Sequence, residues 1–145
     1  MKAPFFLQKF NTEEDTNGSD RDSIFAVWNS SMEDRMKTDC IFCKIVKREI
    51  PETFLYENDN QVVFRDMNPQ APVHILIVPK KHIRSVNDLT EEDEKIVSEM
   101  IMLAKIMAKK ESVSKSGYKL LFNVERGGGQ VIFHLHLHLF GGWEW

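Results

Sequence analysis

The chain has 145 residues, of which 42% are hydrophobic, and its formal net charge at pH 7 is −3. That length predicts a single domain with enough apolar residues for a core. The small negative charge argues against binding to nucleic acid or another polyanion, and no apolar run approaches the ~18 residues of a membrane-spanning helix.

The first segment of the chain, residues 1–37, differs in composition from the rest. Residues 11–22 are polar and rich in turn-forming side chains, which favours mobility, whereas scattered aromatic side chains favour partial docking. We therefore predict a partly disordered N-terminal extension, followed by one domain over residues 38–145. Residues 1–5 do not build a signal peptide, because their apolar stretch is too short, so we expect a cytoplasmic protein.

The domain is predicted to contain a short helix, several strands and one long helix. The short helix covers residues 40 to about 47, and Thr90 with Asp93 forms a capping-box pattern before the long one. Apolar side chains recur at helical spacing in the long helix, at Ile96, Met100, Leu103 and Met107, widened by Val97, Ile101 and Ala104. The expected strands cover residues 53–57, 62–66, 73–78, 118–124 and 131–140. Two helices on a mostly antiparallel sheet make an α+β fold.

Three of the five histidines lie in one alternating run, in which single leucines separate His134, His136 and His138. Alternation is the period of a β-strand, so the imidazoles would leave one face and the leucines the other. The leucine face is typical of a core, whereas the histidine face predicts a reaction surface, because imidazole changes charge near neutral pH. At a rise of about 3.3 Å per residue, two neighbouring histidines can converge on one ion but three hardly can. We therefore expect the three histidines to have different roles.

A glycine-rich loop, Gly127 to Gly129 followed by Gln130, ends about four residues before the histidine run. Glycines allow the backbone to approach a ligand closely, and exposed N–H groups in such a loop suit phosphate oxygens. Imidazole can act as a nucleophile and as an acid or base, so the combination favours phosphoryl or nucleotidyl transfer.

Cys40 and Cys43 form a C-x-x-C motif, which brings two thiolates to one side of a turn. The motif is half of a zinc site, so histidines would have to complete it. A thioredoxin-like redox motif is a weaker alternative, because no βα unit precedes it, and two cysteines without a function are a third. In a cytoplasmic protein we expect the pair to be reduced or metal-bound rather than disulfide-linked.

Several segments match one known signature. Residues 134–140 fit the pattern H-φ-H-φ-H-φ-φ, in which φ is apolar, and residues 66–74, residues 78–82, Asn123 and the ending 139–142 fit the accompanying motifs. Together they resemble the histidine triad (HIT) superfamily, most closely its nucleotide-binding branch, over residues 38–142. The resemblance implies a HIT-like fold, in which a five-stranded antiparallel sheet with two helices pairs into a homodimer.

The same resemblance implies hydrolysis of the P–N bond of purine nucleoside 5′-phosphoramidates. His136 would attack the α-phosphorus and form a nucleotidyl-histidine that water resolves, while His138 and His74 would contact the phosphate. The implied nucleotide-binding residues are Asp66 at the ribose, Asn123, Gly129, Gln130 and Val131 around the phosphate, and Ile41, Phe42, Ile45, Phe64 and Met67 around the purine. For these last five residues, plain core packing explains the apolar side chains equally well.

Some members of the family carry zinc, and the matching residues here are Cys40, Cys43, His82 and His134. The resemblance therefore implies a structural Zn²⁺ site, in which the first histidine of the run binds metal and the other two remain for phosphate. Two departures from the family bear on the rate and the substrate range. Val131 stands where a hydroxyl residue is usual, and the C-terminus after residue 142 is very short.

Two other functions remain open, a dinucleoside polyphosphate hydrolase of another HIT branch and a weakly catalytic nucleotide-binding or scaffold module. Residues 79–82 and the glycines at 141 and 142 favour the phosphoramidase over the polyphosphate hydrolase. Val131 and the N-terminal extension alone support the scaffold. The expected partners are a purine nucleotide conjugate and a second copy of the chain, with no nucleic acid and no membrane.

Overall fold

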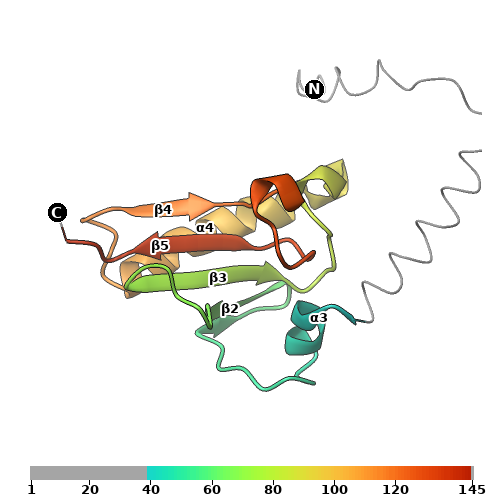
Figure 1. The fold of residues 1–145 in the computed structure, drawn as a ribbon, viewed down its shortest axis with the longest axis horizontal. Coiled ribbons are helices and arrows are strands. Elements are labelled where there is room, and N and C mark those ends of the chain that lie inside the picture. Colours follow the sequence, from blue (N-terminus) through green and yellow to red (C-terminus); the bar gives the residue numbers. More distant parts are fainter. Residues whose placement is uncertain (1–38, 145) are drawn as a thin grey trace, which may run out of the picture. The chain divides into compact units, whose positions relative to one another are not determined.

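The computed structural model describes residues 39–144, so the predicted extension over residues 1–37 lies outside the described part of the chain. The described residues form a five-stranded antiparallel sheet with strand order β1-β2-β3-β5-β4 (Figure 1). The strands are β1 (Tyr56–Glu57), β2 (Gln61–Arg65), β3 (Val73–Pro79), β4 (Tyr118–Leu121) and β5 (Leu137–Gly141). The helices are α3 (Ile41–Val46) and α4 (Glu94–Lys110), with 3-10 turns η1 (Val86–Asp88), η2 (Glu91–Asp93) and η3 (Arg126–Gly128). The predicted α+β fold is confirmed.

The central strands bury both of their faces, because the two helices cover opposite sides of the sheet (Figure 1). One core lies between the sheet and α4, and its members include Ile75, Ile77, Met100, Met107, Leu137 and Leu139. The other core lies between the sheet and α3, and its members include Phe42, Ile45, Phe64, Leu76 and Val78. Successive side chains of a strand alternate between faces, so the almost continuous apolar run of β3 supplies both cores.

Helix α4 is preceded by the predicted capping box. The Thr90 N–H donates to Asp93 Oδ2 at 3.0 Å, and Lys81 Nζ donates to Asp93 Oδ1 at 2.6 Å. The box caps η2, which continues directly into α4. The predicted methionines Met100 and Met107 are core residues, but Ile101, which was expected to widen the buried stripe, is 45% exposed. Within the described residues, no helix is both long and apolar enough to cross a membrane. The cytoplasmic location stays a prediction.

Three predicted strands are too long. The strand expected at 53–57 begins only at Tyr56, and the one expected at 118–124 ends at Leu121. The strand expected at 131–140 is wrong over its first half, because β5 begins at Leu137. The reason is the hydrogen-bond partner: the Leu135 N–H donates to the carbonyl of Ile83, in the loop after β3, instead of to a neighbouring strand. His134 and His136 therefore precede the strand, and His138 lies within it.

Candidate active site

A row of imidazoles lies on the sheet face that α4 does not cover. The backbones of β3 and β5 place His74 and His138 diagonally across neighbouring strands, with His74 Nε2 2.9 Å from His138 Nδ1. The ring of His136 lies 4.8 Å from the ring of His138, measured between centroids. The leucines at 135, 137 and 139 all belong to the α4 core. The prediction that the histidines and the leucines lie on opposite faces is therefore confirmed, although the β-strand begins only at Leu137.

The hydrogen bond of His136 determines which of its ring nitrogens can react. His136 Nδ1 lies 2.6 Å from the backbone carbonyl oxygen of His134. A carbonyl only accepts, so Nδ1 carries the proton, and Nε2 keeps its lone pair in the plane of the ring. An imidazole held in this tautomer is a nucleophile that needs no prior deprotonation.

The other two imidazoles are held in one relay. The Gln70 N–H donates to His74 Nδ1 at 3.1 Å, so the His74 proton is on Nε2 and is donated to His138 Nδ1. His138 Nε2 then carries an N–H. The side-chain amide nitrogen of Asn123 lies 3.4 Å away and is also a donor, so the two groups do not bond each other. The phenyl ring of Phe140, which sequence reasoning did not single out, stacks on His138 at an interplanar angle of 4°. This arrangement presents a neutral donor, His138, beside a nucleophile, His136.

Burial keeps these imidazoles uncharged. It lowers the pKa of His138 to about 4, and the neighbouring His136 and His74 rings act in the same direction. Burial likewise lowers the pKa of His136, and it lowers the pKa of His74 against the opposing effect of the Asp66 carboxylate. At neutral pH the row is therefore neutral, as nucleophilic attack on phosphorus requires.

The residues predicted around the nucleoside occupy different depths. Phe42, from α3, is buried and meets the His136 ring edge-on at 5.1 Å, so it forms a wall of the histidine centre. Ile45 and Phe64 are buried behind it. Ile41 and Met67 are 40% and 82% exposed, so core packing does not explain them. Their role at the purine stays a prediction.

Asp66 follows β2 and turns its side chain toward the histidines. Its Oδ2 lies 3.4 Å from His74 Nε2, and its Oδ1 accepts the N–H of Asn68 at 2.8 Å. The carboxylate is partly exposed, with 21% of the side chain accessible, so it can still meet ribose hydroxyls. That contact also stays a prediction.

The glycine loop lies next to Asn123. A Cβ atom placed on Gly129 would lie 3.7 Å from Asn123 Oδ1, and Gly129 has a φ of +85°. The side chain of Gln130 is used inside the loop, since its oxygen accepts the Glu125 N–H at 2.8 Å and its nitrogen donates to the Arg84 carbonyl at 2.8 Å. Val131 is 85% exposed. The structure thus brings the loop to the histidine row through Asn123, and direct phosphate contacts of Gly129, Gln130 and Val131 stay predictions.

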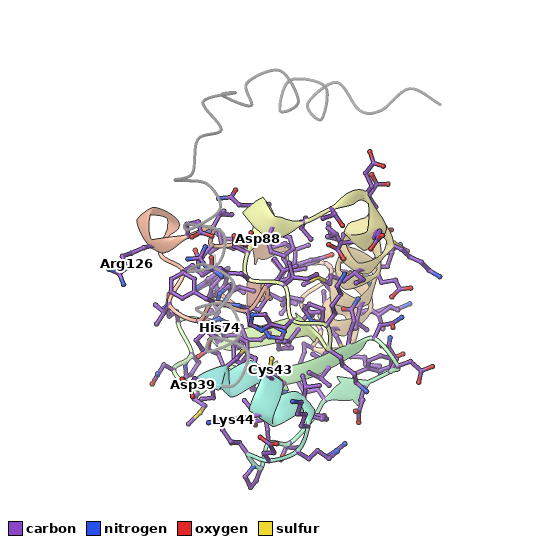
Figure 2. The ribbon with its side chains drawn as sticks, turned by 90° about the vertical axis from the view of Figure 1, so that its right-hand side faces the viewer. Asp39, Cys43, Lys44, His74, Asp88 and Arg126 are labelled. Carbon is purple, nitrogen blue, oxygen red and sulfur yellow. The ribbon has the colours of Figure 1, made fainter. Side chains whose placement is uncertain are left out.

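Four metal-type donors gather beside the row. They come from the N-cap of α3, from α3 itself, from the loop after β3 and from the segment before β5, as Cys40, Cys43, His82 and His134 (Figure 2 labels Cys43 and His74). His134 Nδ1 lies 3.3 Å from Cys40 Sγ, 3.5 Å from Cys43 Sγ and 3.2 Å from His82 Nδ1. Donors on one tetrahedral zinc ion are about 3.3–3.8 Å apart at ordinary zinc–nitrogen and zinc–sulfur distances.

The second nitrogen of His134 makes this cluster more suitable for a metal. Its Nε2 lies 2.7 Å from the Pro79 carbonyl, so Nε2 carries the proton and the Nδ1 lone pair points into the cluster. A second group, Asp66 with His74 and His138, also lies within 4.8 Å. It does not suit a metal, because the Gln70 N–H at His74 Nδ1 leaves the proton on the nitrogen that would have to bind. The cluster with the two cysteines could hold a tetrahedral ion.

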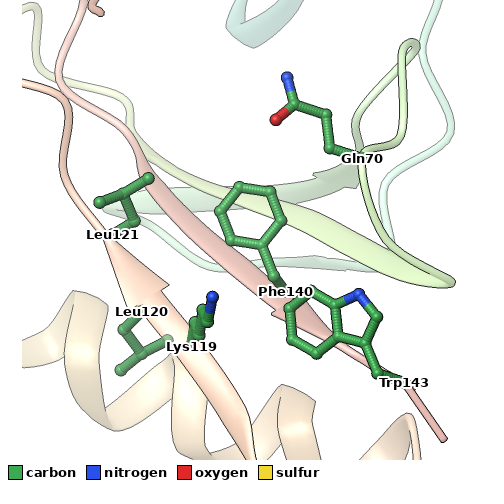
Figure 3. A pocket seen from close by; sticks show the side chains of 6 residues that line it. All are labelled: Gln70, Lys119, Leu120, Leu121, Phe140 and Trp143. Carbon is green, nitrogen blue, oxygen red and sulfur yellow. The ribbon is translucent and has the colours of Figure 1, made fainter. Parts of the chain in front are cut away.

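A hollow of about 510 Å³ lies over Phe140, and Figure 3 shows the side chains that line it. Its floor is Phe140, the ring that stacks on His138, and β4 forms one side. The lining residues are Gln70, Lys119, Leu120, Leu121, Phe140 and Trp143. Gln70 and Phe140 fall within matched motifs, but no local pattern predicts the hollow, because its lining comes from three separate segments of the chain.

The fold and the site define a class of protein, an α+β protein with neutral, oriented imidazoles on one face of an antiparallel sheet. The family model described as "Scavenger mRNA decapping enzyme C-term binding" matches residues 39–142. A purine nucleoside phosphoramidase of Escherichia coli K12 is 45% identical over 107 residues, which are 74% of this chain and 90% of that protein. Protein HitA of Neisseria gonorrhoeae is 41% identical, over 70% of this chain and 94% of its own.

Solved structures agree with these matches. A HIT family hydrolase from Legionella pneumophila superposes with a TM-score of 0.72 at 48% identity, covering 73% of this chain and 95% of that one. A histidine triad protein from Clostridium difficile gives a TM-score of 0.71 at 42% identity, covering 74% and 93%. The chain belongs to the histidine triad family and is a nucleotide hydrolase of that family. The resemblance inferred from the sequence is confirmed.

Proposed function

We propose that this protein hydrolyses the P–N bond of purine nucleoside 5′-phosphoramidates, releasing a nucleoside 5′-monophosphate and an amine. The observation that carries the proposal is the 2.6 Å contact from His136 Nδ1 to the His134 carbonyl, which leaves Nε2 as the nucleophile. The name of the Escherichia coli relative supports the choice of substrate.

The reaction proceeds in two displacements. The lone pair of His136 Nε2 forms a bond to the α-phosphorus while the P–N bond breaks, and the departing nitrogen takes up a proton from solvent and leaves as an amine. The His136 ring becomes cationic, and the His134 carbonyl at its Nδ1–H stabilises that charge. Water then adds its oxygen to phosphorus, replaces the proton that the amine removed, and frees the neutral imidazole. The His138 N–H and the Asn123 amide stabilise the negative charge on the phosphate oxygens.

One assay tests this proposal against its alternatives. The wild-type protein is given an adenosine 5′-phosphoramidate of a simple amine and, in parallel, a diadenosine polyphosphate. Turnover of the phosphoramidate at least tenfold faster supports the proposal. Preference for the polyphosphate would make the protein a dinucleoside polyphosphate hydrolase, and binding of AMP without turnover of either compound would make it a nucleotide-binding module.

We also propose that Cys40, Cys43, His82 and His134 hold a structural Zn²⁺ ion. The support is a soft, four-donor set with spacings close to those of a tetrahedral site, together with the orientation of His134 by Pro79. When bound, zinc cross-links three segments of the fold. Metal analysis of protein purified without added zinc should give about one zinc per chain, and metal-free protein of unchanged stability would contradict the proposal.

We further propose a homodimer. Strand β4 pairs only with β5 among the described strands, so its outer edge offers unpaired backbone groups. The exposed apolar side chains of the described residues include Leu120 and Leu121 on β4 and Ile101, Met102 and Ile106 on α4. An open strand edge together with exposed apolar side chains suits a two-fold pair. Light scattering should give twice the chain mass, and Ile106→Glu should shift the protein toward the monomer.

A further inference from the structure

The backbone of Glu125 adopts a conformation that glycine ordinarily occupies. Its φ is +60° and its ψ is 177°, and side chains with a Cβ are rare in that region. Glu125 comes two residues after Asn123 and immediately before η3, which opens the glycine loop. Such a conformation persists only where the surroundings hold it, so its contacts identify what holds the loop.

Polar contacts of both its side chain and its backbone hold Glu125. Its carboxylate accepts from Arg84 Nη1 at 2.6 Å and from Ser85 Oγ at 2.5 Å, and its N–H donates to Gln130 Oε1 at 2.8 Å. Its carbonyl accepts the N–H of Gln130 at 3.0 Å. The Ser85 hydroxyl, and after it the Arg84 guanidinium, lower the pKa of the Glu125 carboxyl. The glycine loop is thereby fastened to the segment after β3 from both of its ends.

The loop held in this way lies next to Asn123. Glycine has no Cβ, but a Cβ built on Gly128 would come within 3.9 Å of the Asn123 backbone, and one built on Gly129 within 3.7 Å of its side chain. The Asn123 side chain in turn lies 3.4 Å from His138 Nε2. The residues from Arg126 to Gly129 are exposed, and Figure 2 shows Arg126 extending away from the body. Apart from Asn123, the loop therefore depends on its two ends for its position.

We propose that Glu125 is a positioning residue, which acts through Arg84 and Ser85 to hold the glycine loop against Asn123 and so aligns the Asn123 amide with His138. The proposal rests on the proposed function, because it assigns this alignment to phosphoryl transfer. Misplacement of a catalytic group by about 1 Å can cost 10²-fold in rate. Loosening the loop should therefore lower kcat more than it changes the binding of substrate.

A second ion pair in the same chain is a close control. Arg48 also has a positive φ, of +61°, and its Nη2 donates to Glu57 at 2.7 Å. Its guanidinium lies 4.7 Å over the ring of Phe54, just as that of Arg84 lies 4.7 Å over Phe133. The Arg48–Glu57 pair has no hydrogen bond to the glycine loop. Each carboxylate has one further polar partner, Lys80 at 3.0 Å for Glu57 and Ser85 for Glu125, while the Arg48 side chain is more exposed than that of Arg84.

The experiment compares Glu125→Gln and Arg84→Gln with Glu57→Gln and Arg48→Gln, on adenosine 5′-phosphoramidate turnover. In Glu125→Gln and Arg84→Gln we expect kcat to fall about tenfold or more while KM stays within twofold of the wild-type value. In the control variants Glu57→Gln and Arg48→Gln, kcat and KM should each stay within twofold. The double variant at Arg84 and Glu125 should lose little more than either single variant, because the two act as one unit. If the wild-type protein is active and Glu125→Gln and Arg84→Gln keep its kcat, the proposal is wrong.

Glu125→Gly separates positioning from stability, because it relieves the backbone conformation while it removes the side-chain contacts to Arg84 and Ser85. We expect an unchanged or higher Tm, a lower kcat, and faster amide hydrogen exchange at Gly127 to Gly129 without substrate. The Asn123 side-chain amide signal should shift in Glu125→Gln and not in Glu57→Gln. Unchanged loop exchange, or a kcat that follows the folded fraction, would overturn the inference. A wild-type protein without turnover would overturn the proposed function instead, and the loop exchange would still report on Glu125.

Discussion

The neutral state of the histidine row predicts an unusual pH profile. A solvent-exposed imidazole with a pKa near 6.5 is only about 24% neutral at pH 6.0. Burial lowers the pKa of His138 to about 4, so at pH 6.0 this ring is about 99% neutral by the same relation. The shifts of His136 and His74 have the same sign. We therefore expect kcat/KM for a nucleoside phosphoramidate at pH 6.0 to stay within twofold of its value at pH 7.5.

The same shift makes stability depend on pH in a defined window. Between pH 6.5 and about 4, the unfolded chain binds a proton at His138 that the folded chain does not bind. The free energy of unfolding is therefore complete above pH 6.5 and decreases as the pH falls through the window. His138→Gln removes this contribution, so its stability should decline less steeply than that of the wild type over the same range.

Steady-state kinetics across pH 4.5 to 8.0, corrected for uncatalysed acid hydrolysis of the substrate, test the argument together with urea unfolding at each pH. The kcat/KM profile reports the free enzyme, in which the row is buried as described. An acid limb with its midpoint near pH 6.5, or a His138→Gln variant with the wild-type pH dependence of stability, would refute the inference that burial holds the imidazoles neutral.

Three further outcomes are expected. His136→Ala should abolish turnover while the protein stays folded and still binds AMP, as circular dichroism and calorimetry would show; residual activity above a few per cent would remove His136 as the nucleophile. Cys40→Ser should lose the metal and lower Tm by more than about 5 °C, because a structural zinc site contributes folding free energy; full retention of zinc would exclude Cys40 as a ligand. Val131→Thr should raise turnover with little effect on AMP affinity or Tm, since the side chain is 85% exposed and a hydroxyl there could donate to phosphate; a slower variant would show that Val131 does not face the reacting group.

The sequence by itself determined the features that depend on near neighbours in the chain. Alternation of histidine and leucine assigned the two faces correctly, because successive side chains of an extended segment point in opposite directions even where no strand partner is present. The capping box at Thr90 and Asp93 and the two core methionines of α4 were likewise predictable, since a helix brings together residues three and four apart. The distinctive spacing of the histidines and their accompanying motifs also sufficed to recognise the family.

Only the tertiary structure decided what depends on partners far away in the chain. Strand ends were misjudged at residues 131–136 because strand pairing is a property of two segments, and the Leu135 N–H bonds to Ile83 instead. The tautomer of His134 follows from the carbonyl oxygen of Pro79, 55 positions away, which the folded backbone places. Arg84 and Glu125 stand 41 positions apart and carry no motif, so no local pattern could join them. Local periodicity orients side chains, whereas protonation state and alignment at a reacting centre depend on groups that folding alone brings within hydrogen-bonding distance.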